Sequence, residues 1–289
     1  KKPGFTVEML TIPLKEERSQ SFFNKLFMGS TQINTEIPIQ SYSILKEELE
    51  YIGYGDGLPK TISLAVLNNT PKKYITKKTF YFGTDKYGRD LLSRLLIGTR
   101  ISFFIGFIAV FISLFIGIGI GAIAGYYGGK IDALIMWIIN ITWSIPTLLL
   151  VIAITLALGK GYWQVFIAVG LTMWVEVARV VRGQVLTTKQ QQYVEAAKAL
   201  GYSNFRIIFR HILPNILAPI IVISAANFAA AILIESGLSF LGIGAQPPTP
   251  SWGAIIKNHY NYIILGKPYL AVIPGLAIMS LVMAFMLIG

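Results

Sequence analysis

Residues 193–215 read YVEAAKALGYSNFRIIFRHILPN and form a polar segment between strongly apolar parts of the chain. The run that begins at Glu195 consists of strong helix formers, and Gly201 follows it, where a helix end favours a residue that adopts positive φ. Ser203 or Asn204 can then cap a second helix. The stretch therefore predicts two short helices joined at a glycine.

The second of these helices is expected to present two surfaces. Arg206 and Arg210 lie one turn apart on one face, and Pro214 is expected to end the helix. Four apolar side chains recur at spacings of three and four and predict a single apolar face: Phe205, Ile208, Phe209 and Ile212. Such an apolar and basic surface suits insertion into a groove on another protein.

The composition indicates a membrane protein with a polar N-terminal third. Hydrophobic residues make up 54% of the chain, and residues 1–100 carry 25 of its 39 charged side chains. The net charge of +11 fits a membrane protein better than a nucleic-acid binder, because no basic stripe alternates with aromatic residues. The chain has no cysteine, and its two histidines, His211 and His259, are too far apart to predict a metal site.

A helix needs about 20 apolar residues to cross a bilayer, and five apolar segments of this chain reach that length. Ser144 and Pro146 interrupt the second segment, so we expect a kink or local unwinding there. Gly117, Gly119 and Gly121 in the first segment are small enough to allow close helix contacts. The predicted spans are 101–124, 131–158, 163–181, 216–234 and 269–289.

The remaining segments can be placed from their charges. The loop 183–214 is rich in Lys and Arg and is predicted to be cytoplasmic, which places residues 1–100 outside. Residues 1–82 contain no run of spanning length and are predicted to be a polar extracytoplasmic region of undetermined internal structure. The leucine stripe in 83–100 predicts an interfacial amphipathic helix before the membrane domain 101–289. An outside region without a signal sequence implies a sixth span upstream of this sequence.

Four stretches in chain order resemble the ABC importer permeases of the dipeptide/oligopeptide family, in particular the DppC/OppC type. His211 stands where permeases in general have Ile. The resulting sequence, Arg-His-Ile-Leu-Pro-Asn, resembles that of the peptide-transporting branch of the family. The resemblance covers about residues 80–289. The four stretches are the GTDKYGRD segment from Gly83, GYYGG from Gly125 followed by Ser144-Ile-Pro, the Glu-Ala-Ala loop from Glu195 to Pro214, and LSFLGIGAQPPTPSWG from Leu238.

The resemblance implies an all-α polytopic protein with the type I ABC importer permease fold, in the bacterial cytoplasmic membrane. It implies a transport subunit for peptides, partnered by a homologous permease, two ATPase subunits, a solute-binding protein and the lipid bilayer. The chain lacks a Gly-x-x-x-x-Gly-Lys-Ser/Thr loop, so no cofactor is expected in it, and ATP and Mg would be bound by the partner ATPase. The residues implied to contact that ATPase are Glu195, Ala196, Ala197, Gly201, Phe205, Arg206, Phe209, Arg210, Leu213 and Pro214.

Polar residues within the spans are candidates for the pathway or a gate. Glu176 is expected to pair with Arg179, one turn away, in preference to a gating role. Glu235 either lines the pathway or ends its helix in solvent. Asn140, Ser144 and Asn227 either face the pathway or form hydrogen bonds between helices.

Other functions remain open from the sequence. The same architecture could import nickel chelates or sugars. An ion-coupled secondary transporter would need buried acidic relays or an inverted repeat, and the sequence shows neither. A membrane-anchored interaction protein would not explain the Glu-Ala-Ala loop.

Overall fold

A computed structural model describes residues 1–13, 34–45, 48–67, 70–159, 161–245 and 250–289. The chain forms two compact units, Lys1–Ile97 and Gly98–Gly289. The boundary between them lies inside helix α2 (Leu91–Tyr127). Each unit has its own core.

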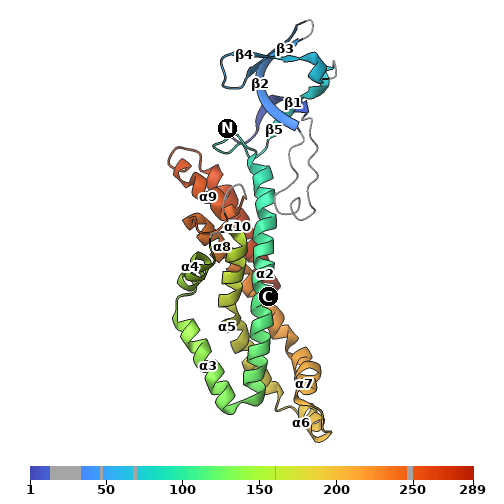
Figure 1. Cartoon of the computed structure of the whole chain (residues 1–289), viewed down its shortest axis with the longest axis vertical. Helices are drawn as coiled ribbons and strands as arrows, with labels where there is room; N and C mark the ends of the chain where they lie inside the picture. Colours follow the sequence, from blue (N-terminus) through green and yellow to red (C-terminus); the bar gives the residue numbers. More distant parts are fainter. Residues whose placement is uncertain (14–33, 46–47, 68–69, 160, 246–249) are drawn as a thin grey trace. The chain divides into compact units, whose positions relative to one another are not determined.

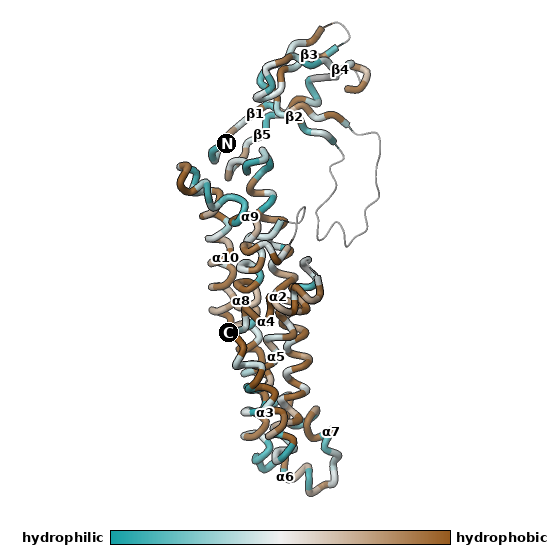
Figure 2. Tube along the Cα trace, turned by 60° about the vertical axis from the view of Figure 1, so that its left-hand side comes forward, coloured by the Kyte–Doolittle hydropathy of each residue, from teal (hydrophilic) through white to brown (hydrophobic). Residues whose placement is uncertain are grey.

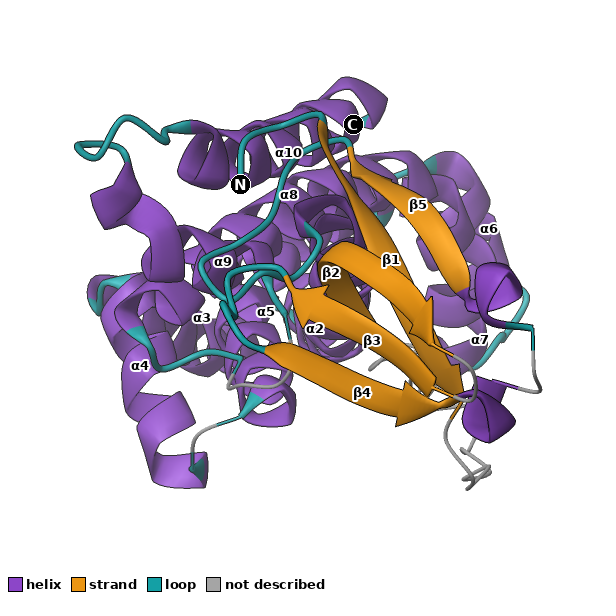
Figure 3. Ribbon diagram, turned by 90° about the horizontal axis from the view of Figure 1, so that it is seen from above, coloured by secondary structure: helices purple, strands orange, loops and turns teal. Residues whose placement is uncertain are grey.

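The N-terminal unit is built on a five-stranded antiparallel sheet (Figure 3). Its strand order is β4-β3-β2-β1-β5, and Leu10, Ile39 and Leu49 lie in its core. The strands contain many β-branched residues, which favour pleated structure. The all-helical prediction therefore holds for the membrane unit only. The elements are β1 (Phe5–Pro13), β2 (Asn34–Leu45), β3 (Glu48–Gly53), β4 (Pro59–Ser63), η1 (Leu64–Leu67), η2 (Pro71–Tyr74) and β5 (Ile75–Phe80).

The second unit is helical and strongly apolar (Figures 1 and 2). Four helical stretches in the described chain are long and apolar enough to cross a membrane, and a bent helix pair makes up to five, the number predicted. After α2 the elements are α3 (Gly129–Ser144), α4 (Thr147–Leu158), α5 (Tyr162–Thr188), α6 (Gln192–Ala199), α7 (Asn204–Arg206), η3 (Ile207–Ile212), η4 (Leu213–Ile216), α8 (Leu217–Leu241), α9 (Trp252–His259), η5 (Tyr260–Tyr262) and α10 (Tyr269–Ile288).

The helix predicted within 83–100 begins at Leu91 and is continuous with the first predicted span. The segment begins with a turn closed by a bridge between Thr84 and Asp90. Asp90 then caps α2 by accepting hydrogen bonds from the backbone N–H groups of Leu92 and Ser93 at 3.3 and 3.2 Å. No proline interrupts the helix after this cap, so α2 continues without a break into the first predicted span.

The second predicted span is broken, as Ser144 and Pro146 indicated: α3 and α4 meet at 90°. Helices α2 and α5 run in the same direction, because Gly117 faces Val177 and Gly125 faces Val185. The chain must therefore return across the unit between α2 and α5. The bent pair is one broken span, since a re-entrant loop would leave α2 and α5 antiparallel.

The α2–α5 contact depends on glycine. A Cβ added at Gly117 would lie 2.5 Å from the Val177 Cβ, and one added at Gly121 would lie 2.5 Å from the Ala178 carbonyl oxygen. A Cβ at Gly119 would meet nothing within 4 Å. Two of the three glycines predicted to allow close helix contacts therefore do so, and Gly119 does not.

The substitution Gly121→Ala is expected to destabilise the helical unit by about 1–3 kcal/mol, because the added methyl group meets backbone that cannot rotate away. Thermal unfolding of the purified protein in detergent should show a lower Tm. The matched control is Gly119→Ala in the same helix, which should leave the Tm unchanged or raise it, since alanine is favoured over glycine inside a helix by roughly 0.5–1 kcal/mol. Equal Tm values for the two variants would contradict the packing described.

Candidate coupling surface and membrane cavity

The segment between α5 and α8 that contains α6, the Gly201 turn, α7 and η3, which we call the knuckle, has the local geometry that its sequence predicts. Helix α6 ends at Ala199, and Gly201 adopts a φ of +77°, the left-handed conformation that glycine tolerates best. The Ser203 hydroxyl oxygen then accepts a hydrogen bond from the Arg206 backbone N–H at 3.4 Å and caps the second helix. The two short helices are thus separated by a fixed turn.

The prediction of one apolar face on the second helix is wrong. Ile208 and Ile212 are buried, but Phe205 and Phe209 are 70% and 54% exposed, with ring centroids 4.3 Å apart. The physical reason is that η3 is a π-helix, whose longer turn brings residues five apart into line. Ile207 and Ile212 therefore share the buried face, and the two phenylalanines lie together on the other side.

The buried face joins the knuckle to the membrane helices. Val194 of α6 and Ile207 of η3 lie in one apolar cluster with Val181 and Val185 of α5. Pro214 does not end the helical path as predicted, because the 3-10 turn η4 carries the chain directly into α8. The knuckle is therefore packed onto the spans and does not hang from flexible linkers.

The predicted coupling residues divide by exposure. Ala197 is buried and Leu213 is half-buried, so both hold the knuckle against the spans. The Arg206 guanidinium lies 4.0 Å from the centre of the Tyr202 ring. The remaining residues are exposed and define what we call the coupling surface: Glu195, Ala196, Gly201, Phe205, Arg206, Phe209, Arg210 and Pro214.

A cavity of about 220 Å³, which we call the membrane cavity, lies at the break between α3 and α4. Trp143 lines it from α3, Glu176 from α5 and Ala230 from α8. Thr142 and Thr172 also line the cavity and add hydroxyl groups to its wall. Three elements that are distant in sequence thus form one partly polar hollow within the membrane unit.

The predicted pair between Glu176 and Arg179 is wrong. Arg179 Nη2 donates a hydrogen bond to Asn140 Oδ1 at 3.0 Å, and the guanidinium lies 3.6 Å from the centre of the Trp143 ring. Helix α3 therefore provides Arg179 with better partners than the neighbouring turn of its own helix. Among the residues that the structure describes, Glu176 has no ion-pair partner and its side chain is exposed.

The position of Glu176 has an energetic consequence. A charged side chain at the centre of a bilayer costs about 2.5–3.5 kcal/mol on insertion scales, so such residues face protein or water in preference to lipid. The membrane cavity is the hollow that Glu176 lines. The carboxylate is therefore placed where water or a polar ligand can reach it.

The other predicted pathway residues separate into two groups. Asn140 and Ser144 lie at the C-terminal end of α3, where the Ser144 hydroxyl donates to the Asn140 carbonyl oxygen at 2.8 Å. Asn227 and Glu235 of α8 are 1% and 0% exposed. Glu235 accepts a hydrogen bond from the Ser239 hydroxyl at 2.7 Å, so it neither lines a pathway nor ends a helix in solvent.

One ion pair between helices was not predicted. Arg182 of α5 binds Asp132 of α3 through two hydrogen bonds of 2.5 and 2.6 Å. The sequence contained a usable signal, since few charged residues occur after residue 100 and an isolated charge in an apolar helix needs a partner. The pair ties the first half of the broken span to α5.

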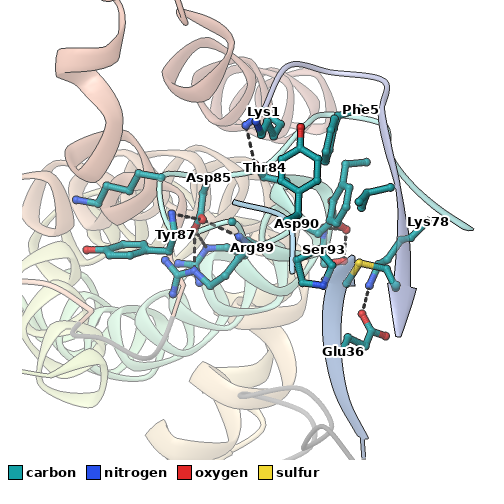
Figure 4. A pocket seen from close by; sticks show the side chains of 18 residues that line it. Lys1, Phe5, Glu36, Lys78, Thr84, Asp85, Tyr87, Arg89, Asp90 and Ser93 are labelled. Carbon is teal, nitrogen blue, oxygen red and sulfur yellow. Dashed lines mark hydrogen bonds and ion pairs between the residues drawn. The ribbon is translucent and has the colours of Figure 1, made fainter. Parts of the chain in front are cut away.

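A larger cavity, of about 700 Å³, lies in the N-terminal unit (Figure 4). The buried Asp85 carboxylate accepts a hydrogen bond from Arg89 Nε at 2.7 Å. Glu36 is paired with Lys78 at 2.5 Å. These two carboxylates already have cationic partners, and Asp90, the third carboxylate in the lining, caps α2, so we assign no function to this cavity.

Comparison with known proteins identifies the family. Residues 117–289 match the family described as the binding-protein-dependent transport system inner membrane component. The chain belongs to this family. The match includes the broken span, the membrane cavity and the whole knuckle. As a member of this family, the chain is a transporter permease and not itself an enzyme.

Individual relatives of this permease are similar over most of their length. The chain is 43% identical over 209 residues to the dipeptide transport system permease protein DppC of Alkalihalophilus pseudofirmus, covering 72% of this chain and 68% of the relative. It is 43% identical over 223 residues to the glutathione transport system permease protein GsiD of Escherichia coli O6:K15:H31, covering 77% and 72%. Among solved structures, an inward-facing form of the MetNI methionine ABC transporter matches with a TM-score of 0.51 and 18% identity, covering 68% of this chain and 97% of that chain. That likeness supports the type I permease fold.

Proposed function

We propose that this permease is a membrane subunit of an ATP-driven importer of short peptides. The observation that carries the proposal is the 43% identity to permeases named for dipeptide and for glutathione transport, because glutathione is itself a short peptide. The alternatives of nickel chelates, sugars or ion-coupled transport have no comparable support.

The proposed assembly contains a homologous second permease, two ATPase subunits and an extracytoplasmic solute-binding protein. The ATPase subunits would bind ATP and Mg. The assembly would lie in the bacterial cytoplasmic membrane. The loop 183–214 would be cytoplasmic and residues 1–100 extracytoplasmic. In support, α6 and α7 lie at the opposite end of the helical unit from α9 (Figure 1), as alternation of the spans requires.

The coupling surface would dock on the ATPase subunit. Closure of the ATPase pair would move the docked knuckle, and the apolar cluster behind it would transmit that movement to α5 and α8. A rigid connection is needed here because a flexible loop would absorb the displacement. The pathway between the two permeases would then open alternately to each side.

The test is the ATPase activity of the purified assembly in lipid with its binding protein, titrated with di- and tripeptides and separately with nickel. We expect peptides to stimulate hydrolysis and nickel to have no effect. Stimulation by nickel alone would overturn the peptide proposal and keep the architecture. If no ATPase subunit co-purifies with the permease, the coupling proposal is overturned.

A further inference from the structure

We propose that the membrane cavity recognises the free amino terminus of a peptide in transit, and that the Glu176 carboxylate is the group that binds its ammonium. This inference rests on the proposed function and adds to it a specificity-determining contact inside the membrane. It follows from the position of the carboxylate, the size of the cavity and the chemistry of its walls.

The first argument is the polar stripe on α5. Thr172, Glu176 and Arg179 follow one another at spacings of four and three, which places them on one face of the helix. Thr172 and Glu176 line the membrane cavity, and Arg179 contacts the adjoining end of α3 through Asn140. A polar stripe on a spanning helix faces protein or water, so the carboxylate lies on the side that a polar cargo would pass.

The second argument is electrostatic. Arg179 is occupied by Asn140 and Trp143, and Arg182 is occupied by Asp132, so the two nearest cations on α5 are directed toward α3. Among the described residues no cation pairs with Glu176, so its carboxyl group remains available to a ligand. A cationic group is the natural partner of such a carboxylate, and an ammonium group offers three N–H donors to it and to hydroxyls such as that of Thr142.

The third argument is the broken helix. The last turn of α3 ends at Ser144 beside the membrane cavity. The last carbonyl groups of a helix lack an α-helical partner; that of Thr142 accepts the Ile145 N–H at 3.3 Å, and those of Trp143 and Ser144 follow it at the break. Unwound backbone of this kind coordinates cations in transporters with discontinuous helices. The first N–H groups of α4, from Thr147, lie at the same break and suit the carbonyl oxygen of the first peptide bond.

The fourth argument is size. A volume of about 220 Å³ is smaller than the roughly 300–1,000 Å³ of pockets that enclose a whole small molecule. The membrane cavity therefore has room for one end of a peptide and not for all of it. Its apolar walls, which include Leu150, Met173 and Ile234, accept a first side chain without selecting its identity. The amino terminus is the feature that peptides of different sequence share.

A zero-length crosslink tests this contact directly in the wild-type assembly. A carbodiimide joins a carboxylate to an amine in contact with it, with loss of one water. We expect trialanine to become attached at Glu176, detected by mass spectrometry of the fragment that contains this residue, and N-acetyl-trialanine to give no product. Absence of the product in an assembly that imports trialanine would overturn the inference. Because no substitution is needed, this test does not depend on a variant folding.

Transport separates this inference from the proposed function. In liposomes with binding protein, Glu176→Gln is expected to lower trialanine import per ATP hydrolysed at least tenfold, and Glu176→Asp to lower it less. The matched control is the same carboxylate-to-amide change at the exposed Glu8 of β1, which should leave the ratio unchanged. Equal import by wild type and Glu176→Gln would overturn the inference alone. Absence of peptide import by the wild type would overturn the proposed function instead.

Discussion

Replacing Gly201 with aspartate is expected to abolish peptide import, with a loss of at least tenfold, while the permease itself still folds. An added Cβ at this position meets no atom within 4 Å, so the new side chain projects from the coupling surface. Two effects then combine. The φ of +77° costs a residue with a Cβ roughly 1–2 kcal/mol, and the docked ATPase would bury an unpaired carboxylate, which costs several kcal/mol.

The control for this substitution is Gly201→Asn, which has nearly the same shape and no charge. Asparagine tolerates the left-handed conformation better than most residues, so we expect this variant to retain most of the import activity. Import and binding-protein-stimulated ATP hydrolysis should be measured on the same reconstituted samples. Normal import by Gly201→Asp would show that the ATPase does not dock at this turn.

Removing the exposed aromatic pair is expected to detach the ATPase subunit. The rings of Phe205 and Phe209 are 70% and 54% exposed and lie 4.3 Å apart, so they form one contiguous apolar patch outside the predicted spans. Contiguous exposed apolar patches mark interaction sites. Central aromatic residues of interfaces contribute about 2 kcal/mol or more each. Because 1.4 kcal/mol corresponds to a tenfold change in affinity, the Phe205→Ala/Phe209→Ala variant should bind the ATPase at least about a hundredfold more weakly.

The helical unit offers a matched control for this variant. Phe111 and Phe115 of α2 are also four residues apart and are 63% and 78% exposed. The Phe111→Ala/Phe115→Ala variant makes the same chemical change within a span, and we expect it to keep the ATPase bound. Co-purification of permease and ATPase from detergent, followed by a measured Kd, distinguishes the two. Equal affinity in both variants would remove the phenylalanine pair from the docking contact.

The knuckle illustrates what local sequence predicts reliably. Gly201 takes positive φ and Ser203 caps the following helix, since both properties depend on one residue and its immediate neighbours. The face of Phe205 and Phe209 was predicted wrongly because it depends on the pitch of the helix. A spacing of 3.6 residues per turn places all four apolar side chains on one face. The packing of Ile207 and Ile212 against α5 favours a π-helical turn, which separates the four side chains.

The candidate pathway residues show the same division. Ser144 and Pro146 predicted the break in the second span, because proline lacks the N–H group that a helix needs. The partner of Arg179 could not be predicted from spacing. Glu176 lies one turn away on the same helix, but Asn140 of α3 meets the guanidinium at 3.0 Å once the two helices pack. Only that packing leaves the Glu176 carboxylate without an ion-pair partner among the described residues.

The sequence by itself determined the membrane class, the approximate positions of the five spans, the break in the second and the two-helix knuckle with its glycine turn. These properties follow from hydropathy, from proline and glycine, and from capping groups, all of which act over a few residues. The tertiary structure decided which glycines of α2 touch α5, which side chains of the knuckle remain exposed, and which charges pair. Those outcomes depend on contacts between residues such as Gly117 and Val177, which are distant in sequence and meet only when the helices pack.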